Sequence, residues 1–332
     1  MAGFVGKILG KLVADFKPPM IFILLHTAIT EMKNTVYVWM DGKFKIMEEA
    51  KVSIMSHSFH HGSAVFEGIR FYAAEKGTAI FRLNDHIDRF FYSASFLGIN
   101  LRYSKDEMAS SIINTIRKNK LKEGYARPIA YYDSSSSGGV EVTPFNCPVK
   151  VAIAVWEWKH SLKNKLLKVK ISPYRRISPK SADINAKISG YYYNSVIAGI
   201  DARKSGYDEA FMLDDEGYVA EATSENIFAV KNGVLFTPKK GSILPGITRD
   251  SVIILAKGIG IEVCEKNISV NELKNSDEVF LTATAAEIIA VGSIDEKLIS
   301  KKEGKITSKL KKLFHLATRG KLIKYRKWIV YI

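Results

Sequence analysis

A single lysine in the middle of the chain lies among residues that suit it for covalent chemistry. Lys187 belongs to the segment 181–194, which is otherwise poor in charge and rich in small and aromatic residues. A lysine amine attacks a carbonyl only when desolvation or a cationic neighbour keeps part of it neutral. We therefore predict that Lys187 is a nucleophile that forms a Schiff base, and not a lysine that only solvates the surface.

Three other features match the needs of an aldehyde cofactor. The commonest partner of a Schiff-base lysine, pyridoxal 5′-phosphate, needs a phosphate site, an acid at its pyridine nitrogen and a polar contact to its ring hydroxyl. The glycine turn at 244–250 opens into an apolar helix whose free backbone amides would bind a phosphate. A small-residue turn at 282–287 offers further donors. Glu221, at the end of an expected strand, is the candidate acid, and an exposed hairpin carboxylate is the alternative.

Two arginines lie in segments whose apolar neighbours indicate burial. Arg70 ends the apolar string 65–70, and Arg127 stands between Tyr125 and Pro128 on an expected strand. A buried arginine needs an anionic partner. Each arginine therefore binds either the carboxylate of a substrate or an internal Asp or Glu.

The histidines and cysteines indicate neither a metal site nor a disulfide framework. His57, His60 and His61 have no Asp, Glu or Cys at a matching local spacing, so we predict no metal site. Cys147 and Cys264 are too few for a disulfide framework and indicate a reducing compartment, the cytoplasm.

The positive charge of the chain is concentrated at its C-terminal end. The net charge is +15, and residues 301–332 hold eleven Lys or Arg against Glu303 alone. No arginine-rich run or recognition motif accompanies this tail. A solvated face on a terminal helix explains it better than a nucleic-acid site does, although a basic nucleic-acid-binding protein stays a distant alternative.

The length of 332 residues and the hydrophobic share of 47% predict two domains with substantial cores. We expect an α/β (α+β) fold of two mixed domains. The expected parts are an extension outside the core at 1–33, a small N-terminal α/β domain at 34–158, a linker at 159–168 and a large C-terminal, cofactor-binding domain at 169–332.

Local patterns predict individual helices and strands within these parts. Alternating apolar residues predict strands at 36–40 and 43–46, joined by the turn Asp41–Gly42. A capping box from Ser104 to Glu107 predicts a helix at 105–120. The other expected elements are strands at 52–55, 125–132 and 149–158, helices at 85–97, 249–258 and 305–315, and a loop at 56–62.

Taken in order, the strings of this chain resemble the branched-chain amino acid aminotransferases, a subgroup of the fold-type IV pyridoxal-phosphate enzymes. The likeness runs from about Val36 to Trp328. The strings that carry it are Met-Ser-His at 55–57, Val-Phe-Glu-Gly-Ile-Arg at 65–70, Tyr-Ala-Arg-Pro at 125–128, Glu-Ala-Thr-Ser-Glu-Asn at 221–226, Leu-Pro-Gly-Ile-Thr-Arg at 244–249 and Thr-Ala-Ala-Glu at 284–287. The family implies an active site at the interface of the two domains.

The resemblance implies a role for each matching position. Lys187 would hold the cofactor covalently and move the proton at the substrate Cα, while Glu221 would pair with the pyridine nitrogen and Tyr192 with the ring hydroxyl. The further cofactor-binding residues implied are Arg89, Ser224, Ile247, Thr248 and Thr284. The substrate-binding residues implied are Phe66, Arg70, Tyr125, Arg127, Thr284 and Ala285, with Arg127 for the distal carboxylate of glutamate and Arg70 mainly shaping the pocket.

Two places depart from the bacterial pattern of this family. His61 stands where that pattern has a tyrosine before a glycine, and the segment 156–163 lacks a tyrosine often found there. These differences bear on the shape of the pocket and not on the cofactor chemistry.

The function implied is reversible transfer of an amino group between leucine, isoleucine or valine and 2-oxoglutarate, as in amino-acid biosynthesis. A D-amino-acid aminotransferase or an aminodeoxychorismate lyase of the same fold is the alternative, which Arg127 disfavours. The family also implies a homodimer or higher homo-oligomer, because its substrate pocket borrows a loop from the partner subunit. The expected partners are small molecules, without nucleic acid or membrane.

Overall fold

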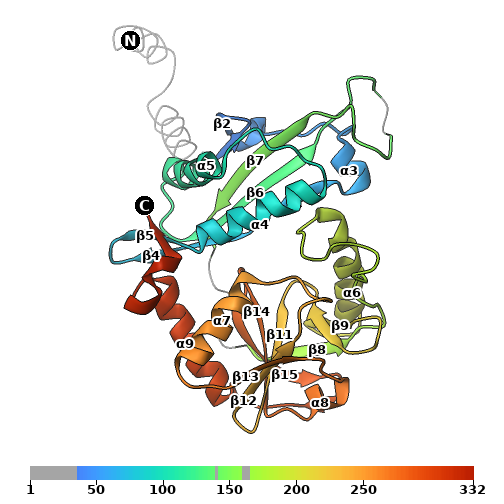
Figure 1. Ribbon diagram of the computed structural model, residues 1–332, viewed down its shortest axis with the longest axis vertical. Coiled ribbons are helices and arrows are strands. Elements are labelled where there is room, and N and C mark those ends of the chain that lie inside the picture. The colour runs from blue at the N-terminus through green and yellow to red at the C-terminus, as the bar shows by residue number, and fades with distance from the viewer. Residues whose placement is uncertain (1–35, 139–140, 159–164) are drawn as a thin grey trace, which may run out of the picture.

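A computed structural model describes residues 36–138, 141–158 and 165–332 of the chain. These residues form two β-sheets, each accompanied by helices, which occupy the upper and lower parts of Figure 1. The predicted mixed α/β fold is therefore confirmed.

The first sheet has the strand order β17-β5-β4-β6-β7-β1-β2, and β3 pairs with β6 beside this path. Its pairings are antiparallel. The strands are β1 (Tyr37–Met40), β2 (Lys43–Ile46), β3 (Ala64–Phe66), β4 (Ile69–Ala74), β5 (Gly77–Phe81), β6 (Gly124–Tyr132), β7 (Val149–Trp156) and β17 (Ile329–Tyr331). The predicted hairpin of β1 and β2 is present, with Asp41 and Gly42 both at positive φ in its turn.

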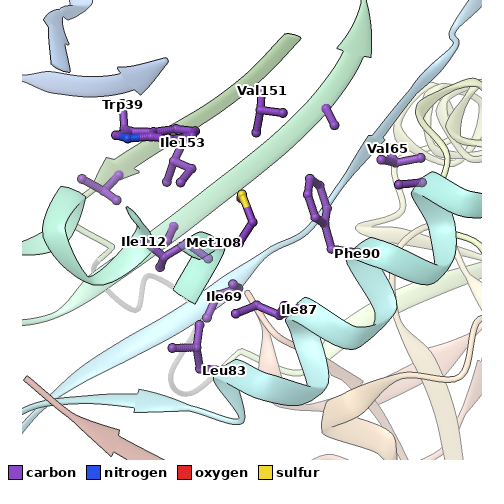
Figure 2. Packing of buried hydrophobic residues seen from close by; sticks show 14 of the residues in the cluster. Trp39, Val65, Ile69, Leu83, Ile87, Phe90, Met108, Ile112, Val151 and Ile153 are labelled. Carbon is purple, nitrogen blue, oxygen red and sulfur yellow. The ribbon is translucent and has the colours of Figure 1, made fainter. Parts of the chain in front are cut away.

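Helices α4 (Leu83–Phe96) and α5 (Lys105–Lys118) pack on this sheet. Figure 2 shows Ile87 and Phe90 of α4 and Met108 of α5 in one apolar cluster with the strand residues Ile69 and Ile153. The predicted capping box of α5 is present, because Ser104 and Glu107 bond each other's backbone amides. Helix α4 begins earlier than predicted, with Arg82 at φ 51° as its N-cap residue.

The segment after β2 differs from the prediction. A short 3-10 turn, η1 (Met47–Glu49), follows β2, and residues 52–55 form no strand. Val52 and Ile54 are exposed, so these apolar residues do not belong to the buried face of a sheet. The predicted loop contains helix α3 (His57–His61), which Gly62 ends in the left-handed conformation at φ 66°.

The second sheet has the order β10-β9-β8-β15-β14-β11-β12-β13, and β16 pairs with β15. Most of its pairings are antiparallel, but β8 lies parallel to β9 and β15, and β12 lies parallel to β13. The strands are β8 (Leu167–Ile171), β9 (Glu209–Leu213), β10 (Val219–Ala222), β11 (Asn226–Lys231), β12 (Val234–Pro238), β13 (Val263–Lys266), β14 (Glu278–Ala283), β15 (Glu287–Ile294) and β16 (Lys297–Leu298).

Helices surround this second sheet and lead back to the first. They are η2 (Ser189–Tyr191), α6 (Tyr192–Lys204), α7 (Ile247–Gly258), α8 (Val270–Lys274), α9 (Lys305–Thr318) and η3 (Ile323–Trp328). After η3 the chain returns to the first sheet as β17, whose three residues pair with β5. The second apolar core accordingly joins Tyr72 and Phe81 of the first sheet to Phe314 and Trp328 of the C-terminal part.

The predicted division into domains stays a prediction. The extension at 1–33 lies outside the described residues, as does most of the linker at 159–168, and β8 begins at Leu167. The C-terminal strand β17 belongs to the first sheet, although the predicted boundary assigns it to the second domain.

Candidate active site

A cavity of about 440 Å³ lies where the two sheets face each other, and it collects residues from many separate segments. The walls come from β3, α4 and β6 of the first part and from β10, β11, α6, α7 and the β14–β15 turn of the second. Every predicted site residue except Arg70 lines it, namely Phe66, Arg89, Tyr125, Arg127, Lys187, Tyr192, Glu221, Ser224, Ile247, Thr248, Thr284 and Ala285.

Lys187 lies just before η2 and is half-buried at the cavity wall. Its Nζ donates a hydrogen bond to the Tyr192 hydroxyl at the start of α6. The same nitrogen lies 4.8 Å from the ring centroid of Phe66 and 4.9 Å from that of Tyr192. The amine thus lies beside two aromatic rings and bonds the hydroxyl of one of them, while its role as the nucleophile stays a prediction.

Glu221 is a buried carboxylate at the end of β10, with a set of hydrogen-bond donors around it. Arg176 donates through Nε at 2.6 Å, Asn226 through Nδ2 at 3.1 Å and Leu244 through its backbone amide at 3.0 Å. Burial raises the pKa of Glu221, and the charges of Arg176 and Lys187 oppose that rise. The three donors therefore compensate the carboxylate in a site that otherwise disfavours its charge.

Arg89 projects from α4 and is held by a fully buried acid. Glu67 accepts from Arg89 Nε at 2.6 Å and from its Nη2 at 3.0 Å, and His86 Nδ1 lies 2.7 Å from the same carboxylate. Although burial acts to raise the pKa of Glu67, Arg89 and His86 hold it far below its usual range. Burial lowers the pKa of His86. Arg89 Nη1 also donates to the Pro245 carbonyl at 3.1 Å, so the arginine joins α4 to the turn before α7.

Helix α7 points its N-terminus into the cavity through Ile247 and Thr248. Gly246 is its N-cap residue, and no side chain caps the first turn. A Cβ at Gly246 would lie 2.0 Å from Asn226 Oδ1, so only glycine allows this close approach. The first-turn amides, which have no partner within the helix, are thus available to an anion.

Arg127 lies on β6, and its guanidinium is surrounded by three aromatic rings. Its guanidinium carbon is 4.8 Å from the ring centroid of Phe66, 5.5 Å from that of Tyr125 and 6.0 Å from that of Trp156. Within the described residues, its buried Nε has no hydrogen-bond partner. The Tyr125 hydroxyl occupies the space where a Cβ at Gly68 would lie, 1.7 Å away.

Arg70 lies behind the cavity and not at its wall, which differs from the expected substrate contact. Its side chain is fully buried on β4 and lies 3.4 Å from Glu123 Oε1 and 3.8 Å from Glu287 Oε1. Arg70 Nη1 also donates to the Ala285 carbonyl at 3.5 Å. Arg70 therefore pairs with internal acids, which was the alternative to a substrate carboxylate. It also contacts the β14–β15 turn through the Ala285 carbonyl.

The histidines of α3 make local contacts away from the cavity lining. His57 Nδ1 lies 2.6 Å from Ser63 Oγ, and His57 Nε2 lies 3.1 Å from the Val142 carbonyl. His61 packs with its ring centroid 4.6 Å from that of His57. Across the described ranges, no group of three or more His, Cys, Asp or Glu gathers as metal ligands. The helices of the same ranges include none with the length and apolarity to cross a membrane.

Four residues around the site were not found from the sequence. Arg176, Glu67 and Asn226 each bond a residue that lines the cavity, and Trp156 packs 5.1 Å from Tyr125 between ring centroids. Glu67 and Asn226 lie inside the strings that carry the family resemblance, so their positions could have marked them as site residues. Their residue types alone did not indicate a role. Arg176 lies far from any such string, and only the folded chain brings it to Glu221.

Comparison with protein families places most of the chain in one of them. Residues 64–294 match the family described as Amino-transferase class IV. A branched-chain-amino-acid aminotransferase of Pseudomonas aeruginosa is 37% identical over 296 residues, covering 88% of this chain and 95% of the relative. The enzyme of the same name from Escherichia coli K12 is 38% identical over 288 residues, covering 85% of this chain and 93% of the relative.

Solved structures with the same fold carry the same name. A branched-chain amino acid aminotransferase from T.th., with pyridoxamine 5′-phosphate, superposes with a TM-score of 0.86 at 38% identity, covering 90% of this chain and 99% of that chain. The branched-chain aminotransferase of Thermoproteus uzoniensis with norvaline gives a TM-score of 0.85 at 37% identity, over 90% of this chain and 99% of that one. The resemblance drawn from the sequence is confirmed.

Proposed function

Because the chain belongs to the class IV aminotransferase family, we propose that it transfers amino groups between branched-chain amino acids and 2-oxoglutarate with pyridoxal 5′-phosphate. The amino donors are leucine, isoleucine and valine, and the products are branched 2-oxo acids and glutamate. One observation carries the proposal: a single cavity combines the enclosed amine of Lys187, the buried carboxylate of Glu221 and the aromatic-framed Arg127.

The donors around the cavity fit this cofactor. Arg89, Arg127 and Lys187 line it as cations against the carboxylate of Glu221, which suits a ligand with phosphate and carboxylate groups. The uncapped start of α7 adds backbone donors for a phosphate. The hydroxyl of Thr282 is buried in the same wall without a hydrogen-bond partner among the described residues, so it offers one more polar contact.

When bound, the cofactor supplies an aldehyde that exchanges amines and a ring that accepts the electrons of the Cα–H bond. Lys187 would hold it covalently and, once the substrate amine has replaced it, would move the proton at the substrate Cα as a general base and acid. Tyr192, bonded to Lys187 Nζ, orients the amine. Glu221 would favour a proton on the pyridine nitrogen, and Arg89 with the start of α7 would bind the phosphate.

Arg127 explains how one pocket accepts two kinds of side chain. The rings of Phe66, Tyr125 and Trp156 give an apolar wall for a branched aliphatic group. The guanidinium among them pairs with the distal carboxylate of glutamate or 2-oxoglutarate. The backbone amides of Thr284 and Ala285, with the Tyr125 hydroxyl, receive the α-carboxylate.

The proposal includes a homodimer in the cytoplasm. Exposed Phe59 on α3 and Phe145 in the loop before β7, at 71% and 90% exposure, support a partner subunit at this end of the first sheet. Cys147 and Cys264 are both free, which supports a reducing compartment.

The direct test follows the absorbance of the purified protein with pyridoxal 5′-phosphate. We expect a lysine-bound chromophore that leucine converts to the pyridoxamine form and 2-oxoglutarate restores. Parallel assays with D-alanine and aminodeoxychorismate separate the related activities of this fold. A protein that takes up no cofactor, or that turns over D-alanine and not leucine, would contradict the proposal.

A further inference from the structure

The backbone of Lys187 is anchored to elements of the first sheet and its helices. Its amide donates to Ser93 Oγ on α4 at 2.8 Å, and its carbonyl accepts from the Phe66 amide at 3.2 Å. The next residue, Ile188, forms an antiparallel bridge with Val65. Both polar groups of the Lys187 backbone therefore depend on α4 and on the segment at the end of β3.

Ser93 is the side chain that makes the amide contact. It is fully buried at 0% exposure, and its hydroxyl also donates to the Arg89 carbonyl one turn earlier at 2.8 Å. The single hydroxyl proton is used toward Arg89, so the oxygen presents a lone pair to the Lys187 amide. The Ser93 hydroxyl is therefore fixed in one orientation, in which it donates to the Arg89 carbonyl and accepts from the Lys187 amide.

The same turn of α4 also holds Arg89 at the cavity. Arg89 is fixed by Glu67, while Ile87 and Phe90 of the helix point into the apolar core in Figure 2. Core packing therefore sets the rotation of α4, and with it the places of both Arg89 and Ser93. This part of α4 therefore positions two candidate site residues. It places the side chain of Arg89, the candidate phosphate-binding residue, and it holds the backbone of Lys187, the candidate nucleophile.

We propose that Ser93 is a positioning residue that aligns Lys187 with the group bound by Arg89. This proposal rests on the proposed function. Without the hydroxyl, the Lys187 amide loses its acceptor in a buried place, and the loop before η2 relaxes away from α4. The amine of Lys187 is then displaced, while Arg127 keeps its contacts with the rings of Tyr125 and Trp156.

The test compares Ser93→Ala with the unaltered enzyme in two independent measurements. In the cofactor-free protein, hydrogen exchange at the Lys187 amide is expected to accelerate about tenfold or more, because the bond that protects it is gone. In the loaded enzyme, kcat is expected to fall about tenfold with little change in KM for leucine. The pH at which the lysine-bound chromophore titrates is expected to shift as well.

Three further variants separate positioning from general loss of stability. Thr115→Val removes a buried hydroxyl that makes the same bond to the carbonyl four residues earlier, but on α5 and away from the cavity. It should leave kcat and the chromophore unchanged. Ser93→Thr keeps the hydroxyl and should restore most of kcat. If Ser93→Ala does not fold, Ser93→Cys fills the site with a weak acceptor and should show the same losses.

The outcomes distinguish this proposal from the proposed function. Normal Lys187 amide protection and normal kcat in Ser93→Ala, within an active enzyme, would overturn the role of Ser93 alone. Equal losses of kcat in Thr115→Val would overturn it too. An unaltered enzyme that binds no cofactor and transfers no amino group would instead contradict the proposed function, and the exchange measurement would still report on the anchor.

Discussion

Two of the charged side chains that line the cavity, Arg89 and Glu221, are each held by a residue that lies behind them. Glu67 holds Arg89, and Arg176 holds Glu221. Both supporting residues are buried, so their pairs act where little water screens them. The chemistry of the site thus depends on residues that do not themselves line the cavity.

The pair of Arg176 and Glu221 leads to a prediction about stability and pH. We expect Arg176→Met to destabilise the cofactor-free protein by about 3 kcal/mol at pH 8, because it leaves a buried carboxylate without its cation. Burial already raises the pKa of Glu221, and losing Arg176 raises it further. A carboxyl whose folded-state pKa is raised loses its stabilising contribution as the pH rises through that value. The deficit should therefore shrink as the pH falls toward the ordinary value of 4.5.

Urea unfolding between pH 4 and pH 8 measures this effect. The double variant Arg176→Met/Glu221→Gln is the control, because it has no charge to protonate at this place and should show little of the pH dependence. A deficit of the same size at both ends of the range would contradict the account.

Arg127 leads to a prediction about substrate choice. We expect Arg127→Leu to raise KM for 2-oxoglutarate at least about tenfold, since a charge-assisted pair with the distal carboxylate is lost. KM for leucine should change much less, because the aromatic wall remains. Steady-state kinetics with each substrate varied separately measure both values. Arg127→Lys keeps the charge without the fork and should be intermediate; equal increases for both substrates would argue against this role.

At the scale of the elements, α4 and the strand ends carry the site. Helix α4 supplies Arg89 and the anchor of Lys187, and the end of β3 supplies Phe66. The β14–β15 turn presents Thr284 and Ala285, and Arg70 donates a hydrogen bond to the Ala285 carbonyl of this turn. The loop before η2, the start of α7 and the β14–β15 turn therefore present part of the site, and β6, β10 and α4 supply Arg127, Glu221 and Arg89 directly.

Elements with strong local signals could be predicted, and elements set by distant contacts could not. The β1–β2 hairpin and α5 follow from a turn and a capping box in the sequence. The start of α4 escaped prediction because Arg82 adopts a left-handed conformation and pairs with Asp85 and Asp250. Asp250 belongs to α7, so no local pattern could reveal that contact.

The capping box of α5 leads to a prediction about stability alone. We expect Ser104→Ala to lower the free energy of unfolding by about 1 kcal/mol, because the amide of Glu107 loses its acceptor. Urea unfolding measures the change, and kcat should stay the same. The control is Ser110→Ala on the exposed face of the same helix, which should be neutral or slightly stabilising. The same loss in both variants would show that the cap is not its cause.

At the scale of the whole molecule, the chain closes on itself. The C-terminal strand β17 pairs with β5, and the core beneath it joins the two sheets through Phe81 and Trp328. Neither β17 nor β5 contributes a residue to the lining of the cavity among the described residues. The last residues of the chain therefore help to hold the two sheets together (Figure 1).

Removing residues 329–332 tests this closure. The truncation takes away the ladder to β5 and the apolar contacts of Val330 and Ile332. We expect a loss of about 3 kcal/mol in stability from the lost hydrogen bonds and buried area. Thermal and urea unfolding measure it, and kcat at low temperature should remain within about twofold. An unchanged melting temperature would mean that β17 contributes nothing to the closure.

Most of the lining of the site could be predicted from the sequence, because the strings that carry it are short and contiguous. Lys187, Glu221 and the start of α7 each have a local signal for their chemistry. The supports could not be predicted in this way, because Arg176 and Ser93 act on partners 45 and 94 residues away. Arg70 lies between these cases, since its burial was expected but its internal partners were not identified.

The central claim is that Lys187 carries the cofactor, and chemical trapping tests it most directly. The protein is loaded with pyridoxal 5′-phosphate, reduced with borohydride, digested and analysed by mass spectrometry. We expect a pyridoxyl group on the peptide that contains Lys187, and neither label nor turnover in Lys187→Ala. Label on another lysine, or undiminished amino transfer by Lys187→Ala, would contradict the claim.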